Sequence, residues 1–181
     1  MYKRQDISFL DLIDTQGDKA IDSLPKKIKQ NERSVAEILA ANMRKMIISE
    51  RPNNPAYFDK MSDLLNHLLQ EQKDGKIQYK ELIKKLIEKL KEARSTIKTK
   101  YPATIDTKGK QALYDNLGKD ETLALRVHET IKANARDGFR DMDSSGLKKM
   151  KALRRAVERV LQGVEVNIDD IMQLIVAQRE Y

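Results

Sequence analysis

Two histidines are the first residues in this sequence whose chemistry could support catalysis or metal binding. His67 and His128 are the only histidines, and each lies in a stretch with a helical pattern. They are far apart in the sequence, and neither belongs to a motif that pairs it with a second histidine on one helix face. We therefore interpret both as ordinary helix residues and predict no metal-binding residue.

A second candidate is the stretch 141–146, which begins like a calcium-binding loop. Asp141 and Asp143 stand at alternate positions before Gly146. The twelfth position of such a loop needs a bidentate glutamate, and here it is Ala152. The basic residues that follow the glycine would also crowd the ion. We interpret this stretch as a polar loop without a cation.

The third candidate is Asp106, which precedes Lys108 with the Asp-x-Lys spacing of a nuclease metal centre. That chemistry needs further carboxylates around the metal, usually on strands, and no pair of strands can be recognised in the sequence. A helical pattern follows directly, so Asp106 or Thr107 is predicted to be its N-cap residue. The sequence thus predicts no catalytic and no cofactor-binding residue.

A different kind of chemistry is offered by the predicted helix over residues 147–161, whose polar side is strongly basic. Six cations are candidates for a contact face: Lys148, Lys149, Lys151, Arg154, Arg155 and Arg159. Glu158 is the single acidic residue among them. Such a face can bind DNA phosphate or an acidic protein, or can simply be solvated. No aromatic residue is interleaved, so stacking on single-stranded bases is not predicted.

The elements that position these residues are predicted to be helices. The chain has 181 residues with only 7 Gly and 4 Pro, and its composition favours an all-α fold. We expect a bundle of about seven to nine helices and no sheet. No apolar run approaches the length of a membrane span, and there is no Cys. The net charge of +7 is compatible with nucleic-acid or acidic protein partners.

Apolar residues recur with the 3.6-residue period along most of the chain. The main helices are predicted over residues 6–15, 18–24, 32–49, 55–73, 77–97, 108–117, 120–135, 147–161 and from 168 onward. The least helical part, 98–106, is predicted to connect a front half, 1–98, which holds a long helical hairpin, with a back half, 99–181, which holds the basic helix. The two halves are expected to form one compact domain.

The long helices 32–49 and 55–73 are joined by a Pro-Asn-Asn-Pro corner. Pro52 disfavours continuation of the first helix, and Pro55 suits the first position of the second. Asn54 is the predicted N-cap residue between them. We expect six residues to hold the geometry of this corner or to contact its partner: Arg44, Glu50, Arg51, Pro52, Asn54 and Pro55.

Several stretches together resemble one protein family. Residues 44–55 with 57–61, then 101–117, then 137–140, and finally 177–181 resemble successive blocks near the C-terminus of the R subunits of type I restriction enzymes. The family usually has Trp where Phe139 stands here. The resemblance covers most of the chain, from about residue 5 to residue 181.

This resemblance implies that the chain is a fragment of a large bacterial subunit. The nuclease domain and the ATP-hydrolysing motor domains of that subunit would lie upstream of Met1, and Tyr181 would stand near its native end. ATP and Mg²⁺ would serve those upstream domains, with no cofactor in this part. The chain itself would be a non-catalytic helical assembly domain of an ATP-dependent, site-specific deoxyribonuclease.

The partners implied by the resemblance are the modification (methyltransferase) and specificity subunits of the same complex, with DNA nearby in the assembled enzyme. The expected location is the cytoplasm, with no membrane contact. The alternative function, which follows from composition alone, is a free-standing basic helical protein that binds nucleic acid.

Overall fold

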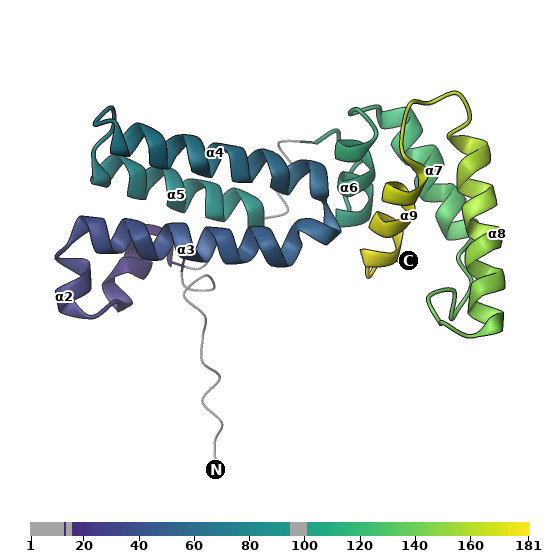
Figure 1. Cartoon of the computed structure of the whole chain (residues 1–181), viewed down its shortest axis with the longest axis horizontal. Helices are drawn as coiled ribbons and strands as arrows, with labels where there is room; N and C mark the ends of the chain where they lie inside the picture. The colour runs from purple at the N-terminus through teal and green to yellow at the C-terminus, as the bar shows by residue number, and fades with distance from the viewer. Residues whose placement is uncertain (1–12, 14–15, 95–100) are drawn as a thin grey trace, which may run out of the picture. The chain divides into compact units, whose positions relative to one another are not determined.

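The computed structural model describes residue 13, residues 16–94 and residues 101–181 (Figure 1). Within these ranges the chain forms eight α-helices, two short 3-10 helices and no strand, which confirms the predicted all-α fold. The predicted helix over residues 6–15, and the predicted last turn before residue 97, fall largely outside the described residues. No helix in the described ranges is both long enough and apolar enough to cross a membrane.

The chain divides into two compact units. The first comprises Met1–Ser49 and Asp59–Ile97, and the second comprises Glu50–Phe58 and Lys98–Tyr181. The sequence prediction had assigned the whole stretch 1–98 to the front half. The structure instead groups the corner, Glu50–Phe58, with the C-terminal helices, for reasons that lie in the hydrogen bonds described below.

The first unit is built on three long helices, α3 (Glu32–Glu50), α4 (Pro55–Lys73) and α5 (Tyr79–Arg94), which lie side by side in Figure 1. The short η1 (Gly17–Ser23) packs against α5, and α2 (Lys26–Lys29) follows it. Leucines and methionines at helical spacing fill the interior, including Leu39, Met43, Leu65, Leu82, Leu86 and Leu90. These are residues of the predicted apolar stripes, so hydrophobic periodicity accounts for this unit.

A tight turn at Gly75 joins α4 to α5. Gly75 has φ +74°, a left-handed conformation that glycine adopts without strain. The backbone N–H of Gly75 donates to the carbonyl of Gln72 at 3.0 Å, and that of Lys76 to the carbonyl of Glu71 at 2.8 Å. This pair of bonds is a Schellman motif, which ends α4 and lets the chain return as α5.

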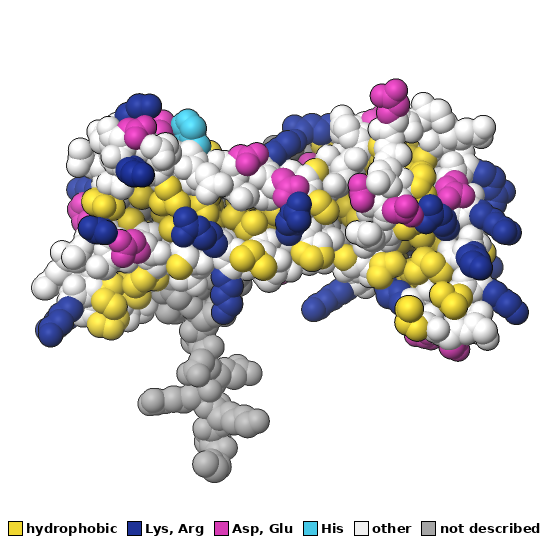
Figure 2. Space-filling model, in the orientation of Figure 1, with side chains coloured by type: hydrophobic (Ala, Val, Ile, Leu, Met, Phe, Trp, Pro, Cys, Tyr) yellow, Lys and Arg dark blue, Asp and Glu magenta, His cyan; other side chains and the backbone are white. Residues whose placement is uncertain are grey.

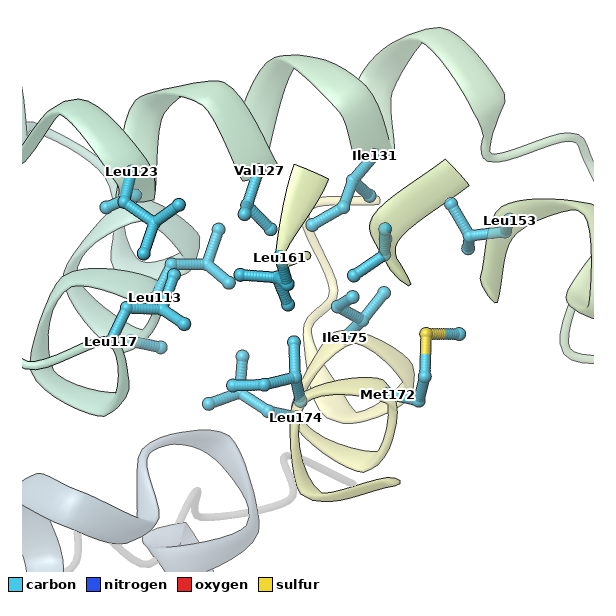
Figure 3. Close-up of a cluster of buried hydrophobic side chains, with 14 of the residues drawn as sticks. Leu113, Leu117, Leu123, Val127, Ile131, Leu153, Leu161, Met172, Leu174 and Ile175 are labelled. Carbon is cyan, nitrogen blue, oxygen red and sulfur yellow. The ribbon is translucent and has the colours of Figure 1, made fainter. Parts of the chain in front are cut away.

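The second unit contains four helices, α6 (Lys108–Asn116), α7 (Glu121–Asn134), α8 (Ser144–Val160) and α9 (Ile168–Ala177), together with η2 (Arg51–Asn53). Their apolar faces meet in one cluster (Figure 3), which includes Leu113, Val127, Ile131, Leu153, Leu174 and Ile175. Side-chain caps begin α6, α7 and α9 at Thr107, Asp120 and Asn167. Of the two predicted caps for α6, the structure selects Thr107.

The start of α8 differs from the prediction. The helix begins at Ser144, so the predicted polar loop over residues 141–146 is wrong in its second half. Asp143 is the N-cap residue, and its Oδ1 accepts a hydrogen bond from the Gly146 backbone N–H at 2.6 Å. A Cβ on Gly146 would lie 2.2 Å from the carbonyl oxygen of Asp141. The glycine is therefore present because the first turn of α8 packs tightly on the preceding loop, and it does not end a loop.

Two apolar residues of the predicted helices are exposed. Leu147 is 46% exposed and Val176 is 40% exposed. Leu147 lies about 120° around α8 from the fully buried Leu153, so it points sideways from the core. Phe139, in contrast, was predicted only as part of a turn and is 3% exposed.

Candidate functional site

The predicted basic face lies on α8. The buried side of this helix consists of Gly146, Leu153, Ala156 and Val157. The opposite side carries four of the six predicted cations, Lys148, Lys151, Arg155 and Arg159, and Figure 2 shows dark-blue Lys and Arg side chains gathered over α8. The amphipathic pattern therefore positions the basic side chains toward solvent.

The structure separates these six cations into two groups. Lys149 donates from Nζ to the Asp137 carbonyl at 2.8 Å. Arg154 bonds to Asp169 of α9 and donates from Nε to Glu158 at 2.8 Å. The hydrogen bonds to Asp169 and then to Glu158 raise the pKa of Arg154 above its ordinary value. Lys149 and Arg154 thus contribute to the packing of the unit and are occupied within it.

The other four cations form a continuous exposed line that we call the basic row: Lys148, Lys151, Arg155 and Arg159. At 100° per residue these four positions fall within about 80° of the helix circumference and span about 16 Å along the axis. Within the described parts of the chain no carboxylate forms an ion pair with any of them. Arg155 and Arg159, with Glu158 and Gln162, also line a shallow open hollow of about 450 Å³.

The corner predicted from the sequence is held by hydrogen bonds that local sequence does not indicate. Asn54 Oδ1 accepts from the Tyr57 backbone N–H at 3.3 Å, which confirms the predicted N-cap. The same side chain donates to Asp115 Oδ2 at 2.8 Å and accepts from Asn116 Nδ2 at 2.9 Å. Asn116 Oδ1 also accepts from the Ala56 backbone N–H at 3.3 Å. Asn54 therefore fastens the corner to the C-terminal end of α6.

The remaining corner residues have more modest places. Glu50 Oε2 accepts from Asn53 Nδ2 at 2.8 Å across η2. Pro52 lies within η2, and Pro55 begins α4, as predicted from its sequence position. Arg51 takes part in a further interaction, so it is engaged rather than free. Arg44 is an exposed residue of α3 in the first unit, which groups it apart from the corner.

The polar contacts around the corner continue to Tyr101 and Gln178. The Tyr101 hydroxyl donates to Asp115 Oδ2 at 2.7 Å. Burial, followed by this hydrogen bond, raises the pKa of Tyr101 well above its ordinary value. Gln178, which is 6% exposed, donates from Nε2 to the Asn53 carbonyl. Gln178, near the C-terminus, thus holds η2 directly, while Tyr101 and Asn54 both bond to Asp115.

Arg140 holds the C-terminal segment. Its guanidinium donates to the carbonyls of Val176 at 3.0 Å, Gln178 at 2.7 Å and Tyr181 at 2.8 Å. Burial lowers the pKa of Arg140 from its ordinary value. A cation at the C-terminal end of α9 also suits the negative end of the helix dipole. This side chain therefore both neutralises the end of α9 and fixes the chain that follows.

The last two residues complete this arrangement. Glu180 accepts from Thr107 Oγ1 and from the Gly109 backbone N–H, both at 2.8 Å, so its carboxylate lies at the N-terminal end of α6. The Tyr181 hydroxyl lies 2.8 Å from Nδ1 of His128, which is 2% exposed. Burial lowers the pKa of His128 and raises that of Tyr181. His128 is thus a buried part of this contact, where the sequence interpretation had made it an ordinary helix residue.

We call these contacts together the C-terminal network; its three hydrogen-bonded groups are joined where Asn53 adjoins Asn54 and Glu180 adjoins Tyr181 in the chain. Its members lie in the second unit: Asn53, Asn54, Tyr101, Thr107, Gly109, Asp115, Asn116, His128, Arg140, Gln178, Glu180 and Tyr181. Sequence reasoning found Asn54 and Thr107 as caps because capping acts over three residues. It missed the others because their partners are separated by up to 125 residues.

Asp106 and His67, the other residues considered for catalysis or metal binding, each interact with a side chain four positions along the sequence. Asp106 binds Lys110 Nζ at 2.7 Å, and this hydrogen bond lowers the pKa of its carboxyl. His67 is exposed, with its Nδ1 3.7 Å from a carboxylate oxygen of Glu71. In the described parts of the chain no three His, Cys, Asp or Glu side chains are grouped so that they could hold a metal ion. All buried side-chain N and O atoms of those parts have a hydrogen-bond partner.

Comparison of the chain with protein-family models, with curated proteins and with solved structures finds no match. An assignment of function must therefore be argued from the residues and geometry of the chain itself.

Proposed function

We propose that this chain is a non-catalytic helical assembly module of the R subunit of a type I restriction enzyme. Its work is to dock the subunit on the methyltransferase core formed by the modification and specificity subunits. ATP hydrolysis, DNA translocation and DNA cleavage, with their ATP and Mg²⁺, belong to domains upstream of this chain. The proposal places the protein in the bacterial cytoplasm.

The single observation that carries the proposal is the C-terminal network. The stretches that resemble the R-subunit family are scattered along the sequence, at residues 44–55 with 57–61, 101–117, 137–140 and 177–181. Each contributes hydrogen bonds to this one network in the second unit. Residues that recur together in the order of a family pattern are expected to share one structural task, and this convergence supplies such a task.

The use of the polar residues also supports an assembly role. The side chains of Arg140, Glu180 and Asn54 form hydrogen bonds with backbone and side-chain groups of the second unit. Buried polar networks that are fully satisfied fix one arrangement of the surrounding helices. A module of this kind presents rigid helix surfaces, which suits docking between subunits.

The proposal is tested with the whole 181-residue chain and the purified core of the parent system. Size-exclusion chromatography should show the chain eluting with the core and not with the core of an unrelated type I enzyme. An excess of the chain should also inhibit ATP-dependent DNA cleavage by the reconstituted enzyme, because it competes with the R subunit, and should leave methylation unchanged. Failure to elute with the parent core, with helical content intact, would contradict the proposal.

The alternative function is a free-standing nucleic-acid-binding protein, which is favoured by the exposed basic row and the net charge of +7. It predicts DNA binding by the chain without binding to any methyltransferase core. The genomic reading frame upstream of Met1 separates the two. The assembly proposal requires that frame to encode nuclease and motor domains continuous with this chain.

A further inference from the structure

The surface of α8 around the basic row is formed mainly by cations and small residues, with Glu158 and the exposed Leu147 along the edge next to Lys151. Lys148, Lys151, Arg155 and Arg159 are all exposed. The other residues within about 60° of Lys148 around the helix are Ser144, Ser145 and Ala152, as the 100° step between residues dictates. Positive charge therefore predominates along this strip, which contains no aromatic ring, and Glu158 is the one carboxylate of α8 at its edge.

The cations at the two edges of the strip are already used. Lys149 lies about 100° from Lys148 and bonds to Asp137, and Arg154 lies about 120° from it and bonds to Asp169 and Glu158. Glu158, the carboxylate nearest the strip, is itself engaged by Arg154. The division leaves a narrow line of four cations directed away from the core.

We infer that the basic row binds the phosphate backbone of double-stranded DNA without reading its sequence. Each strand of a duplex carries a phosphate about every 3.4 Å of axis, so a row about 16 Å long passes several of them. Phosphate contacts need only cations at the surface, whereas base reading needs side chains that reach into a groove. The small residues of the strip allow the helix to approach the backbone closely.

Two other partners fit this strip less well. An interface with an acidic protein is expected to contain buried aromatic or apolar anchors, and the strip offers no aromatic residue and only Leu147 at its edge. Single-stranded nucleic acid is bound by stacking bases on aromatic side chains, and these too are absent from the strip. The inference does not depend on docking to a methyltransferase core, so it can fail or hold separately from the proposed function.

The test compares two variants that each lose three positive charges. K148Q/K151Q/R155Q removes most of the basic row. K80Q/K84Q/K91Q removes three exposed lysines of α5, which lie along one side of that helix and are interleaved with Glu81 and Glu88. All six positions are exposed and on helix surfaces, so both variants should keep the fold, as circular dichroism would verify.

Binding is measured by fluorescence anisotropy on two 25-base-pair duplexes of unrelated sequence, a single strand of equal length and poly-glutamate. Four phosphate contacts predict that affinity for either duplex falls about 150-fold between 50 and 200 mM salt, from a slope of about −0.9 per contact. The same arithmetic predicts a fall of only about 3- to 4-fold for the α8 variant. The α5 variant should behave as the wild type does.

Three results would overturn the inference. Equal weakening by the α8 and α5 variants would mean that binding reflects total charge and not the row. Tighter binding to poly-glutamate than to the duplexes would point to an acidic protein partner. Tighter binding to the single strand would exclude the duplex as the preferred ligand. Loss of core binding with duplex binding intact would count against the proposed function alone.

Discussion

Side chains in the first unit form hydrogen bonds mainly with near neighbours in the chain, such as Arg33 with Glu37 and Gln70 with Asp74. In the second unit they reach much farther: Asn54 bonds to residues 61 and 62 positions away, and Gln178 to a residue 125 positions away. Both units have a core of buried aliphatic side chains. They differ in how far apart in the sequence the side chains that form hydrogen bonds lie.

The two short helices α6 and α9 account for part of this difference. The three main helices of the first unit have 19, 19 and 16 residues, whereas α6 and α9 of the second have 9 and 10. Each helix leaves about four N–H groups and four carbonyls without an internal partner, so short helices have relatively more ends to satisfy. Glu180 at the start of α6 and Arg140 at the end of α9 supply such partners. In the second unit, side chains from distant parts of the sequence thus satisfy the ends of α6 and α9. In the first unit, the long helices have fewer ends per residue to satisfy.

The largest effect is expected from Arg140→Ala. It leaves the carbonyls at the end of α9 without their charged donor, and should lower the free energy of unfolding by about 2–3 kcal/mol. Arg33→Ala is the matched control in the first unit, because it removes an exposed i,i+4 pair and should cost less than about 0.5 kcal/mol. Urea unfolding followed by circular dichroism measures both. Equal losses would remove the distinction between the two units.

A smaller difference is expected between two helix caps. Asn54→Ala removes the cap of α4 together with its bonds to Asp115 and Asn116, and should cost about 2 kcal/mol. Asn31→Ala removes only the cap bond to the Ser34 backbone N–H in α3 and should cost about 0.5–1 kcal/mol. The same urea titration compares them, and a cost for Asn31→Ala at or above that for Asn54→Ala would contradict the account.

The smallest effect concerns pH. Burial lowers the pKa of His128 in the folded chain, whereas the unfolded chain keeps a value near 6.5. The unfolded state therefore binds more protons below about pH 6.5, and the free energy of unfolding should decrease as the pH falls through that value. His128→Gln should make the dependence between pH 7.5 and 5.5 shallower. His67→Gln, at an exposed site, is the control and should leave the wild-type dependence in place.

Much of the fold follows from the sequence because it depends on interactions over three or four residues. The apolar stripes of α3, α4 and α5, and the cap Asn54, were predicted from spacing and residue type alone. The beginning of α8 was not, because Gly146 has the same appearance in sequence whether it ends a loop or allows close packing. The tight contact with Asp141 decides between these, and it is a property of the folded chain.

The candidate sites show the same limit. The cations of α8 were predicted from composition, but the separation of the basic row from Lys149 and Arg154 depends on Asp137 and Asp169. His128 became part of the C-terminal network because Tyr181 lies against it, 53 residues farther along the chain. Such pairings cannot be inferred from a single sequence, since nothing local to either residue indicates the other.

The central claim is that the polar contacts of the C-terminal network, from Asn53 to Tyr181, act together as one structural network. Hydrogen-exchange mass spectrometry of the whole chain tests it directly, by comparing the wild type with Arg140→Ala. We predict faster exchange in α9, at the start of α6 and across residues 53–58, because Arg140 holds the carbonyls of Gln178 and Tyr181, between which Glu180 lies. Exchange in α5 should remain unchanged. Faster exchange confined to α9, with residues 53–58 and α6 unaffected, would contradict the claim.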